Sequence, residues 1–364
     1  MRIGYSHWGF LGPGILDTPD GGRSHRRVLI DGLGTLGHQV VFLQANRDLA
    51  EGGRDLRDRY SWDPGFPELG VLMLEWRWPI PGRNLGIACG TPGHTCDLHR
   101  QTELVGHYTL ARRTPTLLWD KDRRLAIDDP LRGLANVAVC EPALYPTPGA
   151  TSLLFPIADR ALDQADPSGL AATPRPLPLV YVGNQYDRDR AFDAFFAPAA
   201  ARVAHRVAGK WTHTSRWPHV HFTGRCAFTD VDALYRSAVT TVLLLPDRYA
   251  RVGHMTQRLF EAVLAGCLPI TPTTIVGAAQ FTPTALHASS GHHVVARVEQ
   301  LRQLAGTAAH ADLLAACLRS LDQFRLSRQL SIIRHLLEAL TIPADRRFAP
   351  ADVPGEPAHP AGQR

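Results

Sequence analysis

The sequence predicts an α/β protein made of two doubly wound, Rossmann-like domains that face each other across a central cleft. Its 364 residues, 45% of them hydrophobic, are more than one core of usual size requires. Short apolar runs typical of buried parallel strands alternate with helical patterns in both halves. A stretch rich in proline and alanine separates the halves, so we expect one domain on either side of it.

The first half opens with a β-loop-α-β unit. We expect a strand at residues 2–5, a glycine-rich loop at 9–22, an amphipathic helix at 23–36 and a second strand at 39–43. Further buried strands are expected at residues 71–75, 85–89, 116–119, 137–140 and 152–155. We therefore place the first doubly wound domain at residues 1–165.

The interdomain linker is expected at residues 166–178, where four prolines interrupt any regular element. The second domain follows at residues 179–320. Its strands are expected at residues 179–182, 220–223, 241–245 and 268–271, and its helices at 190–207, 230–237 and 256–265. A helical pattern over residues 313–340 predicts that residues 321–342 pack back on the first domain, and residues 343–364 are expected to be disordered.

The charge balance suits an anionic ligand. The formal net charge is +5 and the pI is near 9.0, yet Lys121 and Lys210 are the only lysines. An arginine bias of this kind is typical of a GC-rich genome. Because no run of five or six basic residues occurs, the sequence disfavours nucleic acid as a partner, and a small anionic substrate explains the excess equally well.

The six cysteines are expected to be reduced thiols. The chain starts directly with a strand pattern rather than a signal peptide, which indicates a cytoplasmic protein. No apolar run approaches the roughly 20 residues of a membrane-spanning helix, so no membrane span is expected. The sequence does not determine the oligomeric state.

The strongest local signal is the helix expected to begin near residue 256. The backbone N–H groups at its positive dipole end, where a diphosphate can dock, belong to His254, Met255, Thr256 and Gln257. Arg258 adds a charged fork, and Glu261, three residues on, can accept hydrogen bonds from both hydroxyls of a ribose. The ordinary alternative is a core helix whose apolar residues pack inward while Arg258 pairs with Glu261.

Residues 258–270 read Arg-x-Phe-Glu-Ala-x-x-Ala-Gly-x-x-Pro-Ile, which resembles the donor-sugar motif of retaining GT-B glycosyltransferases. Spore-coat-type glycosyltransferases have a similar Arg-x-Phe-Glu stretch. The resemblance implies the GT-B fold and a nucleotide-diphosphate sugar as donor, with a UDP-sugar favoured. It also implies that Glu261 binds the donor ribose and that residues 254–257 hold the diphosphate.

Two further stretches of the second half are similar to this family. Residues 180–190 resemble the strand and glycine loop that open its donor domain, and residues 220–225 resemble the segment that meets the nucleotide base. The donor-binding residues that these stretches imply are Gly183, Asn184, Arg188, Arg190 and Arg225. Asn184 stands where an arginine is common, and residues 251–253 lack the second glutamate of many retaining members, so the sugar and the stereochemical outcome stay open.

The first half carries a glycine loop that is also similar to the family. Gly21 and Gly22 precede the first predicted helix, and Gly-His-x-Val follows it at residues 37–40. Glycine lets the backbone approach a sugar or a phosphate without a Cβ in the way. We therefore expect the first domain to be the acceptor side and the second to bind the donor.

Sugar transfer requires a group that takes the proton of the acceptor. The catalytic candidates are His94, Asp20 and Asp120, which follow predicted strands or lie in the glycine loop, and His7 and Asp17 lie at the same predicted edge. Each has an ordinary alternative. His94 could be a surface or capping residue, Asp20 a turn residue, and Asp120 a helix cap or a partner of the lysine that follows it.

A zinc site is the alternative interpretation of the histidines and cysteines between residues 89 and 99. Cys89, His94, Cys96 and His99 are suitable ligands, but their spacing matches no standard finger. We therefore expect no metal and no cofactor beyond the nucleotide sugar itself, as the resemblance implies.

The sequence thus favours a glycosyltransferase that moves a sugar to a small-molecule acceptor. This acceptor could be a nucleobase or another intermediate of bacterial specialised metabolism, such as antibiotic biosynthesis. Three alternatives stay open: a nucleotide-sugar epimerase on the same fold, glycosylation of a nucleic acid, and a non-catalytic module that binds DNA or polysaccharide. Steep salt dependence of binding would support a nucleic acid.

Overall fold

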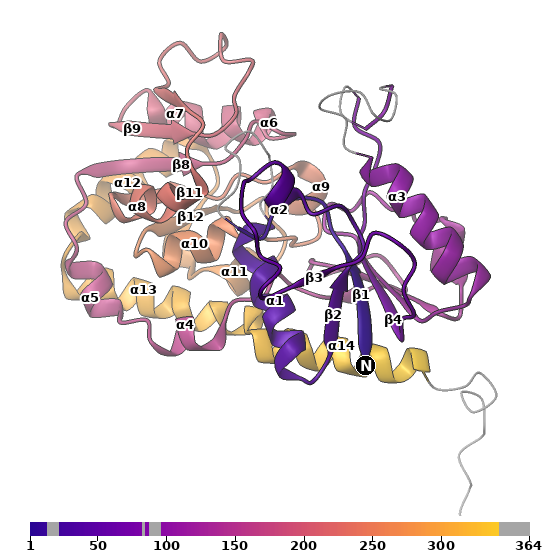
Figure 1. Ribbon diagram of the computed structural model, residues 1–364. Helices are drawn as coiled ribbons and strands as arrows, with labels where there is room; N and C mark the ends of the chain where they lie inside the picture. Colours follow the sequence, from indigo (N-terminus) through magenta and orange to yellow (C-terminus); the bar gives the residue numbers. More distant parts are fainter. Residues whose placement is uncertain (13–21, 82–83, 87–95, 342–364) are drawn as a thin grey trace, which may run out of the picture.

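The computed structural model describes residues 1–12, 22–81, 84–86 and 96–341, and it contains two parallel sheets flanked by helices (Figure 1). The first sheet has the strand order β3-β2-β1-β4-β5-β6-β7. Its strands are β1 (Arg2–Ser6), β2 (Gln39–Phe42), β3 (Ser61–Trp62), β4 (Val71–Glu75), β5 (Thr116–Trp119), β6 (Val137–Glu141) and β7 (Thr151–Ser152). All five residues of β4 are buried, as expected of a parallel strand that is covered on both faces.

The second sheet has the order β10-β9-β8-β11-β12-β13, again with parallel neighbours. Its strands are β8 (Leu177–Val182), β9 (His205–Ala208), β10 (Phe222–Gly224), β11 (Ala238–Val242), β12 (Leu268–Pro272) and β13 (His287–Ala288). In each sheet the chain order reverses beside the first strand of the domain, β1 or β8. Loops diverge at such a switch point and leave a crevice at the carboxyl ends of the strands.

The helices cover both sheets. Those of the first domain and of the segment that joins the domains are α1 (Arg23–Thr35), α2 (Arg47–Ala50), α3 (Asp97–Leu104), α4 (Asp159–Asp163) and α5 (Pro167–Ala172). The rest are α6 (Asp189–Ala191), α7 (Ala197–Ala200), α8 (Val231–Arg236), α9 (Asp247–Ala250), α10 (Arg258–Leu264), α11 (Ala278–Phe281), α12 (Gly291–Leu304), α13 (Ala308–Ser320) and α14 (Leu326–Thr341). Among the described residues, no helix has the length and apolar character that crossing a membrane requires.

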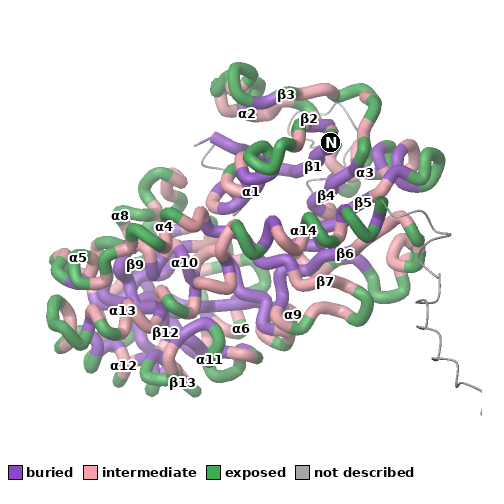
Figure 2. Tube along the Cα trace, turned by 90° about the horizontal axis from the view of Figure 1, so that it is seen from below, coloured by how far each residue is buried: buried purple, intermediate pink, exposed green. Residues whose placement is uncertain are grey.

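The last helix, α14, lies along the first domain, beside α1 and β6 (Figure 2). A Cβ on Gly32 of α1 would lie 3.0 Å from the side chains of Leu326 and Leu330, so the two helices approach closely. The backbone N–H of Leu326 donates to the carbonyl of Ile157 at 2.8 Å. The start of α14 is therefore hydrogen-bonded to the segment that follows β7.

The segment between the two sheets is more regular than its prolines predict. Residues 167–172 form the helix α5, and β8 already begins at residue 177. Pro167 occupies the first turn of α5, where a missing N–H costs nothing, and the Asp166 carboxylate accepts hydrogen bonds from Ser168 N and Gly169 N at 3.0 Å each. The expectation of an irregular stretch was wrong, because it did not take into account that Asp166 caps a helix in which Pro167 is the first residue.

The helix expected at residues 190–207 is also wrong in its second half. The structure has α6, a π-helical turn at Phe192–Phe196, α7 and then the strand β9. In β9, Val207 and Ala208 are buried between two neighbouring strands. A short apolar run of this length fits a helix or a strand equally well, and only the neighbouring strands decide between them.

Three other elements differ from expectation. Leu85 is 50% exposed and forms only an isolated bridge with Pro81, so the strand expected from residue 85 is absent over its described residues 85–86, and residues 87–89 lie outside the described residues. The strand expected at 152–155 is limited to β7. The single helical pattern at 313–340 is two helices, α13 and α14, separated by a 3₁₀ turn at Leu321–Phe324. Residues 343–364 lie outside the described residues.

The loops at the carboxyl ends of the two sheets meet each other. The hydroxyl of Tyr249, after β11, donates to the Asp122 carboxylate after β5 at 2.5 Å. Arg123 Nη1 donates to the carbonyl of Arg248 at 3.1 Å. The predicted arrangement of two Rossmann-like domains that face each other is therefore confirmed, and the strand ends of both domains border the same region.

Candidate functional site

The second-domain part of the site lies where β8 ends against the start of α10. Arg258 Nε donates to the carbonyl of Val182, the last residue of β8, at 2.7 Å, and Nη1 donates to Thr256 Oγ1 at 3.4 Å. A Cβ on Gly183 would lie 2.4 Å from Arg258 Nε, and the φ angle of Gly183 is +156°. Glycine is required here because a side chain would displace the guanidinium.

Glu261 lies one turn further along α10 and contacts the first domain. Ser24, in the first turn of α1, donates its hydroxyl to Glu261 Oε1. Burial raises the pKa of Glu261, while the Ser24 hydrogen bond and the charge of Arg258 oppose this rise. Within the described part of the chain, no cation forms an ion pair with Glu261. The carboxylate therefore keeps the capacity to accept hydrogen bonds from a ligand.

His254 precedes α10 and is fully buried at the domain interface. Its ring stacks on Tyr249 with ring centroids 3.8 Å apart and planes inclined by 14°. Burial lowers the pKa of His254 well below its ordinary value, and the charges of Arg123, Arg248 and Arg188 lower it further. Among the described residues, neither ring nitrogen has a hydrogen-bond partner. His254 is therefore a neutral, tightly packed imidazole.

The other residues expected at the start of α10 are less accessible than a phosphate loop would suggest. Met255 and Thr256 are buried, and Gln257 is partly exposed. Arg190, expected in the preceding glycine loop, has an 83% exposed side chain that pairs with Asp247 at 2.8 Å. These side chains therefore range from buried to largely exposed.

The remaining donor-binding candidates also differ in orientation. Arg188 points inward and donates to the carbonyls of Leu244, Asn184 and Tyr186 at 3.2, 3.3 and 2.8 Å. Asn184 Oδ1 accepts a hydrogen bond from the backbone of the loop after β9. Arg225 is exposed just beyond β10. The buried Arg188 side chain thus fixes the loop after Gly183 through its backbone carbonyls.

Among the first-domain candidates, Gly21, Asp20 and His94 lie outside the described residues. Gly22 is the N-cap of α1. A Cβ at this position would lie 2.2 Å from Arg26 Nη2, so the side chain of Arg26 occupies the space that a larger residue would need. This glycine is therefore required for a side-chain packing contact.

Asp120 is fully buried and closes the turn after β5. Its carboxylate accepts hydrogen bonds from the backbone N–H groups of Arg124 and Leu125 at 2.9 and 2.7 Å. Burial raises the pKa of Asp120, and these two hydrogen bonds oppose the rise. The turn that it shapes brings Asp122 and Arg123 to the domain interface. This geometry gives Asp120 a role in positioning the loop.

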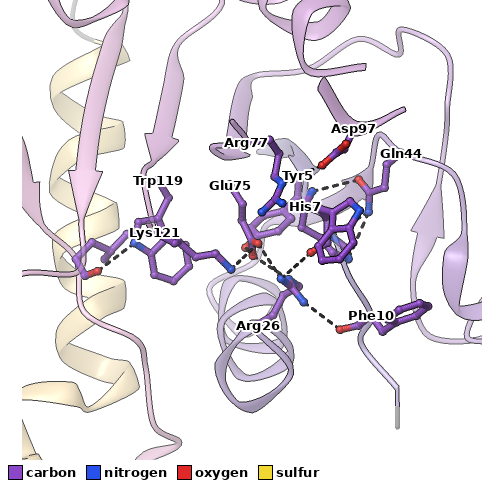
Figure 3. Close-up of polar contacts among 12 residues, drawn as sticks. Tyr5, His7, Phe10, Arg26, Gln44, Glu75, Arg77, Asp97, Trp119 and Lys121 are labelled. Carbon is purple, nitrogen blue, oxygen red and sulfur yellow. Dashed lines mark hydrogen bonds and ion pairs between the residues drawn. The ribbon is translucent and has the colours of Figure 1, made fainter. Parts of the chain in front are cut away.

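A buried charge cluster that was not predicted from the sequence lies at the end of β4 (Figure 3). Glu75 Oε1 accepts hydrogen bonds from the Tyr5 hydroxyl and from Arg26 Nε, both at 2.8 Å. Glu75 Oε2 accepts from Arg26 Nη2 at 2.8 Å and pairs with Lys121 at 2.5 Å. Burial alone would raise the pKa of Glu75, but Arg26 and Lys121 hold it well below its ordinary value. The available signal was a glutamate that ends an otherwise apolar strand.

A cavity of about 300 Å³ opens beside this cluster in the first domain. It is lined by residues that follow β1, β2 and β4 and by the start of α3. Gln44 Nε2 donates to His7 Nδ1 at 2.9 Å, and Arg77 Nε donates to Asp97 Oδ2 at 3.1 Å. Figure 3 shows Arg77, Asp97 and Gln44 above the Glu75 cluster and His7 beside it. The cavity is large enough for part of a small ligand.

The structure describes only part of the alternative zinc site. Cys89 and His94 lie outside the described residues, and Cys96 is exposed. Within the described ranges, His, Cys, Asp and Glu side chains do not gather in groups of three that could hold a metal.

No protein-family model matches the chain, and no curated protein matches it in sequence. Solved structures match its fold over nearly the whole length. T4 phage β-glucosyltransferase, in complex with UDP and Mn²⁺, superimposes with a TM-score of 0.62 at 12% identity, covering 94% of this chain and 100% of that chain. AviGT4, a glycosyltransferase involved in avilamycin A biosynthesis, gives 0.57 at 12% identity with coverages of 93% and 97%. Anabaena HepE, in complex with UDP-glucose, gives 0.56 at 11% identity with coverages of 93% and 100%. The likeness establishes the GT-B fold.

Proposed function

We propose that this protein is a glycosyltransferase that transfers a sugar from a nucleotide-diphosphate sugar, with a UDP-sugar favoured, to a small-molecule acceptor. The observation that carries the proposal is the position of Glu261. This carboxylate has no pairing cation among the described residues, and it lies where the strand ends of both GT-B domains meet. Structures of the same fold contain UDP or UDP-glucose, which supports a UDP-sugar as the donor.

The donor would lie along the second domain. Glu261 would accept hydrogen bonds from the ribose hydroxyls, and Arg258 would offer charge to the diphosphate next to the backbone of Gly183. The φ angle of Gly183 and its close packing against Arg258 both require glycine, so no side chain covers the backbone there. Binding of the ribose would separate Ser24 from Glu261 or share the hydrogen bond between them, so donor binding would be coupled to the contact between the domains.

The reaction forms a bond between the anomeric carbon of the sugar and a nucleophilic atom of the acceptor. The bond from the anomeric carbon to the β-phosphate oxygen breaks, and its electron pair leaves with the nucleoside diphosphate. The proton of the acceptor passes to a base or, late in the reaction, to the leaving diphosphate. His94 and Asp20 remain predicted bases, and the cavity adds His7 and Asp97 as candidates.

The role of His7 and Asp97 can be tested with the substitutions His7→Gln and Asp97→Asn. A base that acts on the acceptor contributes roughly 100-fold or more to turnover. We expect that loss in kcat from one of the two variants, with UDP affinity unchanged. Wild-type kcat in both variants would remove His7 and Asp97 from the mechanism. The candidate bases would then be His94 and Asp20, which lie outside the described residues.

The donor assignment is tested by thermal shift with UDP, GDP, TDP, CMP and their sugars. A ligand at about 100 times its Kd adds roughly 2.7 kcal/mol of stability, so one nucleotide should raise the Tm clearly. Glu261→Ala should abolish this rise, whereas Glu338→Ala, at an exposed site on α14, should preserve it. A Tm that no nucleotide changes would refute the proposal.

Transfer to a nucleic acid is the second candidate, because another matched structure is that of a DNA-modifying β-glucosyltransferase. The match to AviGT4 supports a small molecule of antibiotic biosynthesis instead. Binding of a DNA duplex across a range of salt concentrations discriminates between them. A steep decline of the binding constant with salt would favour nucleic acid, and no measurable binding would favour the small molecule.

Epimerisation of a nucleotide sugar is the remaining enzymatic alternative. The matched structures described above are glycosyltransferases, which favours transfer to an acceptor. Product analysis after incubation with the nucleotide sugar alone decides the question. A change in the sugar without any acceptor would identify an epimerase.

A further inference from the structure

Arg77 is a preorganised arginine on the wall of the first-domain cavity. Its Nε donates to Asp97 at 3.1 Å. The guanidinium carbon lies 4.9 Å from the centre of the Trp8 ring and 4.7 Å from that of Trp78. The side chain is only 11% exposed. These contacts fix the guanidinium in one orientation, so little rotational freedom is lost when a ligand binds to it.

The terminal nitrogens of Arg77 are available for a ligand. Within the described residues, neither Nη1 nor Nη2 has a hydrogen-bond partner. Arg47 also lies over the Trp8 ring and lines the same cavity, and its buried Nη1 lacks a partner among the described residues. Buried N–H groups are rarely left without an acceptor, since each one loses its hydrogen bonds to water. The unmatched Nη1 of Arg47 therefore indicates an absent acceptor group, and Arg77 lines the same cavity.

The surrounding charge leaves an excess of cations. The described charged residues that line the cavity, with their ion-pair partners, comprise Arg26, Arg47, Arg77, Arg100, Lys121, Glu51, Glu75, Asp97 and Glu103. Five are cationic and four are anionic. The carboxylates are engaged with Nε of Arg77 and with other nitrogens, so they do not cover the donors that are unmatched. An anion that enters the cavity would complete the charge balance.

We propose that Arg77, with Arg47, binds a phosphate group of the acceptor, so that the natural acceptor is a phosphorylated compound. The assignment of this phosphate to the acceptor rests on the proposed function, whereas the phosphate site itself follows from the cavity. A guanidinium with two free terminal nitrogens matches two phosphate oxygens, and a third oxygen remains for a neighbouring donor. The same chemistry could come from a small phosphate monoester or from the phosphodiester of a nucleic acid.

The test is titration calorimetry on protein saturated with UDP, so that the donor site is filled first. The probes are glycerol phosphate, a monoester, and a short DNA oligonucleotide, which supplies phosphodiesters. Arg77→Gln should weaken binding of the relevant probe at least ten-fold, and Arg77→Lys, which keeps the charge without the fork, should weaken it less. Arg57→Gln, at a 62% exposed surface site, should bind like the wild type.

The two probes also identify the source of the phosphate. Binding of glycerol phosphate that depends on Arg77 indicates a small phosphorylated acceptor, and binding of the oligonucleotide that depends on Arg77 indicates nucleic acid. The proposal is overturned if neither probe binds to the UDP-saturated wild type, or if binding is unchanged in both Arg77 variants. Failure of UDP itself to bind would refute the proposed function separately, and dependence on Arg77 would then still report on the phosphate site.

Discussion

Each domain places a glycine, an arginine and a glutamate together at the carboxyl edge of its sheet. The first-domain set is Gly22, Arg26 and Glu75, and the second-domain set is Gly183, Arg258 and Glu261. Arg26 forms two hydrogen bonds of 2.8 Å to Glu75. Arg258 instead donates to a backbone carbonyl and, within the described residues, forms no ion pair with Glu261. We call the first set closed, because its arginine pairs with its glutamate, and the second set open, because its glutamate has no such pair among the described residues.

The two carboxylates therefore respond to pH in opposite ways. Because Arg26 and Lys121 hold the pKa of Glu75 well below its ordinary value, its ionised form stabilises the fold above the ordinary glutamate pKa. That stability is lost as the pH falls through the lowered pKa. Burial raises the pKa of Glu261, so the fold is favoured while Glu261 is protonated, and this contribution is lost as the pH rises through the raised pKa. At neutral pH the buried, ionised Glu261 therefore lowers the stability of the fold, and this loss accompanies a carboxylate that is available to a ligand.

The largest expected effect comes from opening the closed set. Glu75→Gln leaves Arg26 and Lys121 buried without their counter-charge, and breaking a buried pair in this way costs about 3–5 kcal/mol. We expect this loss in the free energy of unfolding, measured by urea denaturation at neutral pH. Glu338→Gln, at an exposed site, is the control and should change little. A loss below about 1 kcal/mol would show that the two sets do not differ as described.

Glu261→Gln tests the open set and should have the opposite effect on stability. Losing a charge-assisted hydrogen bond to a ribose costs about 1.5–3 kcal/mol, so UDP affinity should fall roughly ten-fold or more in calorimetry. The free energy of unfolding without ligand should stay equal or rise at neutral pH, and this gain should shrink as the pH falls below the ordinary glutamate pKa. A variant with wild-type UDP affinity would remove Glu261 from the donor site.

The glycines sharpen the same comparison. In Gly22→Ala the new Cβ meets Arg26 Nη2, so we expect a stability loss of about 1–3 kcal/mol from overpacking. In Gly183→Ala it meets Arg258 Nε, and UDP affinity should fall more than stability. Gly306→Ala, between α12 and α13, is a suitable control, because its φ angle is +81° but its Cβ would meet no atom within 4 Å. Equal effects of Gly183→Ala and Gly306→Ala would mean that backbone strain, rather than the arginine, explains both.

The smallest effect is expected from Ser24→Ala. The hydroxyl of Ser24 donates to Glu261 and lowers the pKa of this carboxylate, so its removal should raise that pKa further. UDP affinity measured against pH should then begin to fall at a higher pH on the acid side than in the wild type. The stability change should stay near 1 kcal/mol, as for one ordinary hydrogen bond. An unshifted pH profile would argue against the contact between the two domains.

The strands were the most predictable part of the fold. The run Val71–Glu75 was predicted residue for residue, because a strand buried on both faces is a nearly continuous apolar run, here ended by Glu75. The strand His205–Ala208 was missed, because its short apolar run carries no period that excludes a helix. Pro167 was taken as a break in regular structure, since its compatibility with a helix depends on a cap that is visible only in the folded chain.

The candidate site could be predicted only in part. The sequence placed Arg258 and Glu261 on one helix at the edge of a sheet, because their spacing is a property of the helix itself. The direction in which Arg188 and Asp120 point could not be read from the sequence, because both bond to backbone atoms that the local fold supplies. The cavity and Arg77 were not predicted, since their residues come from separate loops.

The sequence by itself determined two α/β domains and the helix that carries Arg258 and Glu261, since strand and helix patterns depend on residues close together along the chain. Only the tertiary structure decided which carboxylate is closed by cations and which stays open. Glu75 meets Arg26 and Lys121 across separations of tens of residues, and Ser24 meets Glu261 from the other domain. Charge pairing and burial depend on distance in space, and the packing of the two domains sets those distances.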